Sequence, residues 1–290
     1  MLEWFEISTG LTLVATATRA FLHVPRSFGA DPFRTPMRGT GDPATTHWLL
    51  EGSIAFAGRT FHAERRAKSN ERVRVSPAHW AYRLAGYYHT THATRRLLPK
   101  LSQRFAASGR HGLALWAEQK LSEEVGHDLL ALRDLSELGY PAQGLVGALV
   151  PPRAAAWVAL FEQLAQAEDP VGCVGYAHAL ERLALLSGAA EVSAIEQALP
   201  RGVNATRCLR VHSALGSDPD HVRTNVTTTF ALSAGERTAI ASACHQTARI
   251  YFDPALDDDF QARSLEALVL EFRASRARAP SFSRQLEPIR

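Results

Sequence analysis

Acidic side chains and a histidine occur at helical spacing in residues 118–128, a segment framed by apolar residues. On a helix, residues three and four apart lie on one face, so His127 can pair with Glu124 or with Glu123. A carboxylate and an imidazole on one face are ligands that suit iron, manganese or zinc. Glu-x-x-His is also common on solvated helices, so this segment indicates a metal site only if other segments supply further ligands.

A second candidate ligand, Glu181, stands in a segment that is apolar nearly all round. His178 and Glu181 are the main polar interruptions of residues 174–185. A buried carboxylate costs several kcal/mol unless it is paired or bound to a metal ion. Glu181 is therefore expected either to bind a metal ion or to pair with an arginine such as Arg182.

A third group of acids and imidazoles lies in residues 212–221 and includes His212 and Asp220. In this segment Asp218-x-x-His221 repeats the Glu-x-x-His spacing. Asp218 also belongs to a Gly-Ser-Asp-Pro sequence, which is ordinary chemistry for the start of a helix. In helical bundles, pairs of such motifs from different helices, each with an added carboxylate, hold two iron ions.

The three segments lie in a chain of predicted helices. Ser76-Pro77 is a plausible helix start, and Gly139 is a plausible helix end. Apolar spacing predicts helices over residues 78–107, 112–138, 154–166, 170–187, 192–199, 204–215 and 234–252, with a further one starting at Asp218-Pro219. Residues 76–252 would thus form a bundle of six to eight helices. The first of these helices carries no acid, which disfavours a ferritin-like iron site, because that site needs one there.

The first 70 residues do not hold a helical period for long. Turn residues are dense in 29–43, and short strands are expected at 11–16 and 53–61, the second with a Gly58-Arg59 turn. We interpret residues 1–70 as an N-terminal arm of uncertain structure that serves as a lid, an appendage or an oligomer contact.

Composition predicts a globular protein. Of the 290 residues, 46% are hydrophobic and 21% are charged, and the net charge of +3 is not gathered in a basic run, so nucleic acid is not indicated. Three widely spaced cysteines argue against a disulfide framework and favour a reducing cytoplasm. Glu3 and Glu6 do not suit a signal peptide, and no apolar run is long enough for a membrane helix.

Taken in order, the motifs resemble the heme-oxygenase-like diiron oxidases and oxygenases, relatives of the thiaminase-like and pyrroloquinoline-quinone-synthase-like helical folds. The resemblance rests on Glu-x-x-His, then Gly-x-x-x-x-Leu-Glu at 175–181, then a histidine followed by Asp-x-x-His. It implies a mainly α, seven-helix domain over residues 71–290 that holds two iron ions. The implied ligands are Glu124, His127, Glu181, His212, Asp218 and His221.

The spacing departs from the family pattern in one place. His212 and Asp218 are six residues apart where the family has four, so a regular helix would place them on different faces. A π-bulge or a helix break would restore their convergence. Alternatively His212 does not bind, or Asp220 substitutes. The first carboxylate also stays open, since Glu118 or Glu123 could replace Glu124.

The resemblance implies an enzyme that uses Fe(II) and O2, with an external electron donor, to oxidise a small molecule in a biosynthetic pathway. An amine or amino-acid-like substrate is the first choice, to be N-oxygenated or oxidatively cleaved. An arginine of the acid-free helix, Arg83, Arg95 or Arg96, could clamp its carboxylate. Nearby His89, His92, Tyr87 and Tyr88 belong to the same helix. Homodimers are common among such bundles.

Other functions fit the same residues. A fatty-acid-directed diiron oxidase would keep the metal site and change the substrate. A metal-free thiaminase-like hydrolase would need a cysteine nucleophile, Cys173 or Cys208. A cofactorless oxidase of the same fold would need no metal ligands. A helical binding or scaffold protein would use the acids and histidines only as paired core groups.

Overall fold

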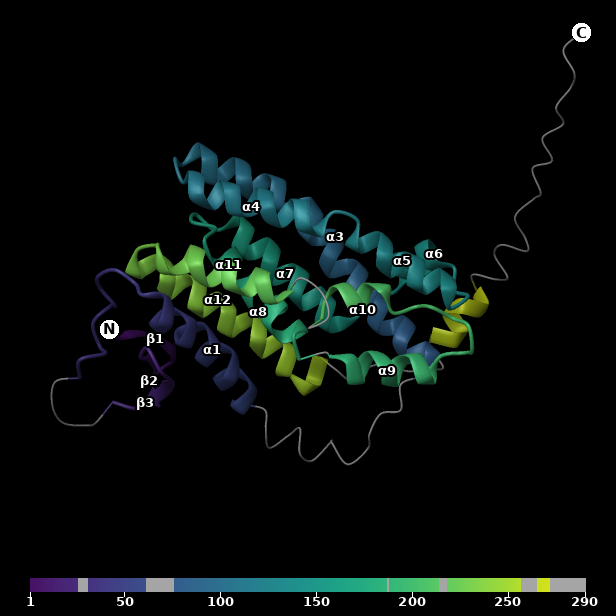
Figure 1. The fold of residues 1–290 in the computed structure, drawn as a ribbon, viewed down its shortest axis with the longest axis horizontal. Coiled ribbons are helices and arrows are strands. Elements are labelled where there is room, and N and C mark those ends of the chain that lie inside the picture. The colour runs from purple at the N-terminus through teal and green to yellow at the C-terminus, as the bar shows by residue number, and fades with distance from the viewer. Residues whose placement is uncertain (26–30, 61–75, 187, 214–217, 257–264, 272–290) are drawn as a thin grey trace, which may run out of the picture.

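Helices make up most of the chain in a computed structural model, which describes residues 1–25, 31–60, 76–186, 188–213, 218–256 and 265–271 (Figure 1). A three-stranded antiparallel sheet comes first, in the order β1 (Glu3–Ser8), β2 (Leu11–Ala15) and β3 (Ala20–His23). The helices that follow are α1 (Pro43–Thr60), α3 (Pro77–Ala107), α4 (His111–Glu124), α5 (His127–Glu137), α6 (Ala142–Ala148), α7 (Pro152–Gln166), α8 (Gly172–Ala184), α9 (Ala189–Ala198), α10 (Arg207–Val211), α11 (Asp218–Phe230) and α12 (Ala234–Phe252), with a 3-10 turn at Pro254–Leu256.

Local sequence explains where the long helices begin. Ser76 caps α3 by accepting a hydrogen bond from the His79 backbone N–H, and Pro77 follows at the first helical position. Ser233 and Glu236 form a reciprocal capping box at the start of α12. The expected mainly α fold, with a small β element near the N-terminus, is confirmed.

Helix α8 lies at the centre of the packing, against α12 and α11, while α3 packs on α4, α5 and α7. At Gly175 of α8, an added Cβ would stand 2.0 Å from the Ile240 carbonyl oxygen of α12. Only glycine allows the two backbones to come this near, and the contact fixes the helix that carries Glu181.

The N-terminal segment shares a hydrophobic core with the bundle. Phe5 and Leu13 of the sheet and Leu49 of α1 belong to the same buried cluster as residues of α8 and α12. A buried ion pair, Arg237 Nε to Glu3 Oε1 at 2.7 Å, also joins β1 to α12. Figure 1 shows the three strands beside α1 at one end of the molecule, and α6 and α9 toward the other end.

Two expectations about elements are wrong. The strand and turn expected at 53–61 are absent over residues 53–60, which belong to α1, whose buried Leu49, Leu50, Ser53 and Ala57 recur at helical spacing. Residue 61 lies outside the described residues. Residues 112–138 are not one helix, because the helix is interrupted between α4 and α5 at Gly126, which has a left-handed φ of 87°. The strand expected at 11–16 is confirmed as β2.

The helices expected at 78–107, 154–166, 170–187, 192–199 and 234–252 are confirmed as α3, α7, α8, α9 and α12, with small differences at their ends. The helix expected at 204–215 is shorter, since α10 ends at Val211, and residues 214 and 215 lie outside the described residues. Among the described residues, no single helix is long and apolar enough to cross a membrane. One sharply bent pair, Ala142–Ala148 with Pro152–Gln166, meets the length and composition criteria.

Candidate metal site and adjoining cavity

The break between α4 and α5 positions the first two candidate ligands. Glu124 is the last residue of α4 and His127 the first of α5, so the two flank the turn at Gly126. His127 Nδ1 lies 3.2 Å from Glu124 Oε2. The two residues that the sequence paired therefore do lie close together, although a turn brings them together and not one helical face.

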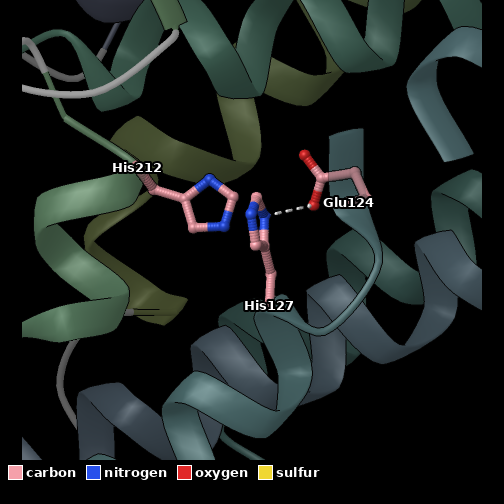
Figure 2. A group of neighbouring side chains, drawn as sticks. All are labelled: Glu124, His127 and His212. Carbon is pink, nitrogen blue, oxygen red and sulfur yellow. Dashed lines mark hydrogen bonds and ion pairs between the residues drawn. The ribbon is translucent and has the colours of Figure 1, made fainter. Parts of the chain in front are cut away.

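His212 completes a cluster of three, as Figure 2 shows, with the His127 ring between Glu124 and His212. His212 directly follows α10 as its C-cap residue, and its ring meets that of His127 edge to face, with centroids 4.6 Å apart. One ligand atom from each of the three side chains lies within 4.8 Å of the others. Ligand atoms that share one ion lie at most about 4.3 Å apart, so small side-chain movements suffice for binding.

A buried carboxylate from α5 holds α10 in place. Asp134 Oδ2 accepts a hydrogen bond from the Cys208 backbone N–H at 2.9 Å, and its Oδ1 lies 3.0 Å from Arg207 Nη1. The Asp134 side chain is fully buried. A helix of only five residues has little stability of its own. Asp134 therefore fixes the position of His212 relative to His127.

The charges around Glu124 favour its ionised form. Burial raises the pKa of this carboxyl, but the hydrogen bond with His127 and the nearby His212 and Lys120 outweigh it, so the pKa lies below its ordinary value. An ionised carboxylate beside two imidazoles is the donor set that non-heme Fe(II) oxygenases use, and it also suits manganese or zinc. Glu124, His127 and His212 could thus hold one metal ion.

A second polar group adjoins the first, and we call it the Lys120 cluster: Lys120, Glu123, Glu181, His221 and Asn225. Lys120 Nζ lies 2.9 Å from both Glu123 Oε2 and Glu181 Oε1. Asn225 Nδ2 donates to Glu181 Oε2 at 2.5 Å, and His221 Nε2 lies 3.3 Å from Glu123 Oε2.

The predicted ligands are thus divided between two groups. Glu124, His127 and His212 converge, whereas Glu181 and His221 belong to the Lys120 cluster. Asp218 begins α11, and its side chain lies outside the described residues. Asp220 is exposed and pairs with Arg223.

The other acids and bases that the sequence singled out have other partners. Glu118 is exposed and accepts a hydrogen bond from Ser102. Arg182, the expected partner of Glu181, pairs instead with Glu51.

Sequence reasoning missed Lys120 and Asn225. Lys120 is three residues before Glu123 and four before Glu124, so helical spacing placed it on the face of the carboxylates. Asn225 is fully buried and accepts a hydrogen bond from Trp116 Nε1 at 2.8 Å. Its position four residues after His221 was the available signal.

A cavity of about 500 Å³ opens beside both groups. Glu124 and His212 line it from the three-residue cluster, and Lys120 and Glu181 line it from the Lys120 cluster. Its walls combine aliphatic, aromatic and small polar side chains with a few charged ones; the aromatic and small polar residues include Tyr87, Thr90, Thr91, Trp157, Phe161 and Tyr176. This volume is typical of sites for small molecules.

An ion pair stands in the wall of the same cavity. Arg83 Nη2 lies 2.8 Å from Glu191 Oε1, and both residues line the cavity. The other two arginines considered as substrate clamps have partners outside the cavity: Arg95 contacts Asp128, and Arg96 pairs with Glu162.

His178 and the cysteines are buried and electrically neutral. Both ring nitrogens of His178 have no hydrogen-bond partner in the described part of the chain, and burial lowers the pKa of this imidazole to about 3. Burial also raises the pKa of the thiols of Cys173 and Cys208. Cys173 lines the cavity, so it is the better placed of the two candidate nucleophiles.

Neither the known protein-family models nor the curated proteins include a match to this sequence. Solved structures do match its fold. One is a domain of unknown function with a heme oxygenase-like fold from Shewanella denitrificans, with a TM-score of 0.51, 15% identity, and coverage of 80% of this chain and 95% of that one. Another is a TenA homolog from Pseudomonas syringae pv. tomato, with a TM-score of 0.52, 15% identity, and coverage of 75% and 98%. The chain therefore has the heme oxygenase-like fold.

Proposed function

We propose that this protein is a non-heme iron-dependent oxidase or oxygenase that acts on an amine or amino-acid-like substrate. The observation that supports the proposal is the convergence of Glu124, His127 and His212 at the wall of a cavity. Two imidazoles and one carboxylate leave coordination positions open, which suits dioxygen chemistry. A ferrous ion bound there would supply the activation of O2.

The protein's own residues would bind and shield the substrate. Glu124 and His212 face the cavity, whereas His127 does not line it and supports the site from behind. Trp157 and Phe161 line the cavity, and such aromatic side chains would help to keep water from a bound substrate. Asp134 keeps His212 within reach of the other two ligands through α10.

The ion pair between Arg83 and Glu191 supports an amino-acid-like substrate. A zwitterion carries a carboxylate and an ammonium group. It could separate Arg83 from Glu191 and bind between them, so that each residue exchanges its present partner for the oppositely charged group of the substrate. The guanidinium would then bind the substrate carboxylate, and the Glu191 carboxylate would bind the amine. A fatty acid offers only the first of these contacts.

The test begins with anaerobic loading of the purified chain with ferrous iron, followed by oxygen uptake with amino acids, amines and fatty acids. We expect iron to bind and to be lost on Glu124→Ala or His212→Ala in folded protein. Arg83→Gln and Glu191→Gln should raise KM for the amino-acid substrate. Arg96→Gln, at a surface ion pair outside the cavity, is the matched control and should leave KM unchanged. Absence of iron binding by folded wild-type protein would refute the proposal.

The two-iron version that the resemblance implies remains a prediction. It requires a second iron ion bound by Glu181, His221 and Asp218. In the structure, the Glu181 carboxylate is already in contact with the Lys120 ammonium. The two-iron version also requires an external electron donor, and it shares the substrate test above.

A metal-free thiaminase-like reaction is the second candidate. The TenA homolog shares the fold, and Cys173 lines the cavity. This reaction needs a thiolate, whereas burial raises the pKa of the Cys173 thiol. Cys173→Ser separates the two proposals, because it would abolish a thiol-dependent reaction and leave iron binding intact.

A further inference from the structure

The Lys120 cluster contains the groups of a second metal site around an ammonium ion. Two carboxylates from different helices, Glu123 of α4 and Glu181 of α8, both lie 2.9 Å from Lys120 Nζ. His221 of α11 lies 3.3 Å from the same Glu123 oxygen. Carboxylates and an imidazole are also ligand types that a divalent cation accepts.

The ammonium group is held firmly in this position. The Lys120 side chain is only 3% exposed, and Glu181 is fixed from its other oxygen by Asn225. Asn225 is in turn held by the Trp116 indole N–H. A buried lysine must be paired, and here both of its carboxylate partners are supplied by the protein.

We propose, building on the proposed function, that Lys120 takes the place of a second metal ion, so that the protein binds one metal ion per chain. A divalent cation bound to Glu123 and Glu181 would stand close to the ammonium and be repelled by it. The single ion is then held by Glu124, His127 and His212. Lys120 supplies one positive charge at the cavity wall, where the diiron relatives that the sequence resembles would hold the second iron.

The experiment counts metal ions. Apoprotein is titrated anaerobically with ferrous iron and separately with cobalt(II), whose visible absorption reports coordination, and bound metal is measured after dialysis. Wild type should bind one ion per chain. Lys120→Gln, whose amide still donates hydrogen bonds to the carboxylates but carries no charge, should bind two. Lys120→Arg keeps the charge and should stay at one. Adding Glu181→Gln to Lys120→Gln should return the count to one.

Each result decides the proposal. Two ions in wild type would overturn it without any variant, even if Lys120→Gln failed to fold. One ion in both wild type and folded Lys120→Gln would also overturn it. If wild type bound no metal, the iron-dependent function would fail. The role of Lys120 would still be decided by whether Lys120→Gln gains one ion that Glu181→Gln removes.

Discussion

Replacing Asp134 tests whether a buried carboxylate outside the three-residue cluster positions one of its members. Asp134→Ala removes the acceptor of the Cys208 backbone N–H and the partner of Arg207. The first bond resembles a helix cap and contributes about 0.5–2 kcal/mol, or up to about 3 kcal/mol because the acceptor is charged. The ion pair with Arg207 contributes only about 0.5–1 kcal/mol, because solvent screens the Arg207 side chain, which is 26% exposed. Together these two contacts predict a loss of about 1–4 kcal/mol in the free energy that keeps α10 folded against the bundle.

The affinity for metal should fall with it. His212 directly follows α10, so loosening this helix lets the imidazole move away from His127, and loss of such supporting contacts typically costs about 10–100-fold in metal affinity. Asp134→Asn should cost less, because its amide oxygen still accepts from the Cys208 N–H. Urea unfolding and cobalt(II) titration measure the two effects.

Glu137→Gln is the matched control for the Asp134 variants. Glu137 contacts the same arginine, Arg207, at 3.2 Å but is 42% exposed. Its loss should change the free energy of unfolding by less than about 0.5 kcal/mol. Unchanged metal affinity in folded Asp134→Ala would refute the role of this residue, and an equal loss in Asp134→Asn would show that the Cys208 bond is not what holds α10.

Three further predictions concern α8. Because the pKa of His178 falls from 6.5 to about 3 on burial, the stability that its neutral ring provides is complete above pH 6.5 and is lost as the pH falls toward 3. At pH 5 the free energy of unfolding should be lower by about 2 kcal/mol than at neutral pH. Denaturant titrations at several pH values measure this decrease, which should be absent in His178→Gln. Gly175→Ala should lower the melting temperature sharply or prevent folding, since its Cβ would meet the Ile240 carbonyl oxygen at 2.0 Å, and a stable variant would contradict the packing. Tyr176→Phe should leave stability unchanged or raise it by up to about 1 kcal/mol, because the buried hydroxyl has no partner among the described residues, and should raise KM if substrate supplies that partner.

The long helices could be predicted because their signals are local. The start of α3 at Ser76 and Pro77, and of α12 at Ser233, follow from residues within one turn of each helix. The prediction of a strand over residues 53–60 is wrong because alternation over a few residues is equally compatible with a helix whose buried face is set by the core. Gly126 was a possible helix end of the same kind as Gly139, but the apolar spacing that continues past it favoured a single helix.

The sequence could predict which residue types form the candidate site, but not which of the predicted ligands lie together and which contact Lys120. Glu124, His127 and His212 were expected together on the resemblance, and the structure brings them together across a turn and the end of a short helix. Which of the predicted acids would meet Lys120 depends on how α4 and α8 approach each other. That approach is set by contacts such as Gly175 on Ile240, which are far apart in the sequence.

Lys120 shows why spacing alone cannot count metal ions. Helical spacing puts Lys120 and Glu124 one turn apart on α4, and both line the same cavity. In sequence, a lysine among glutamates suggests a solvated salt bridge, because lysines are seldom buried. Lys120 is buried, however, and its ammonium contacts two carboxylates that would otherwise attract a second cation. The set of ligands and the number of ions are therefore separate questions, and our proposal is that in this chain the number of ions depends on one basic side chain.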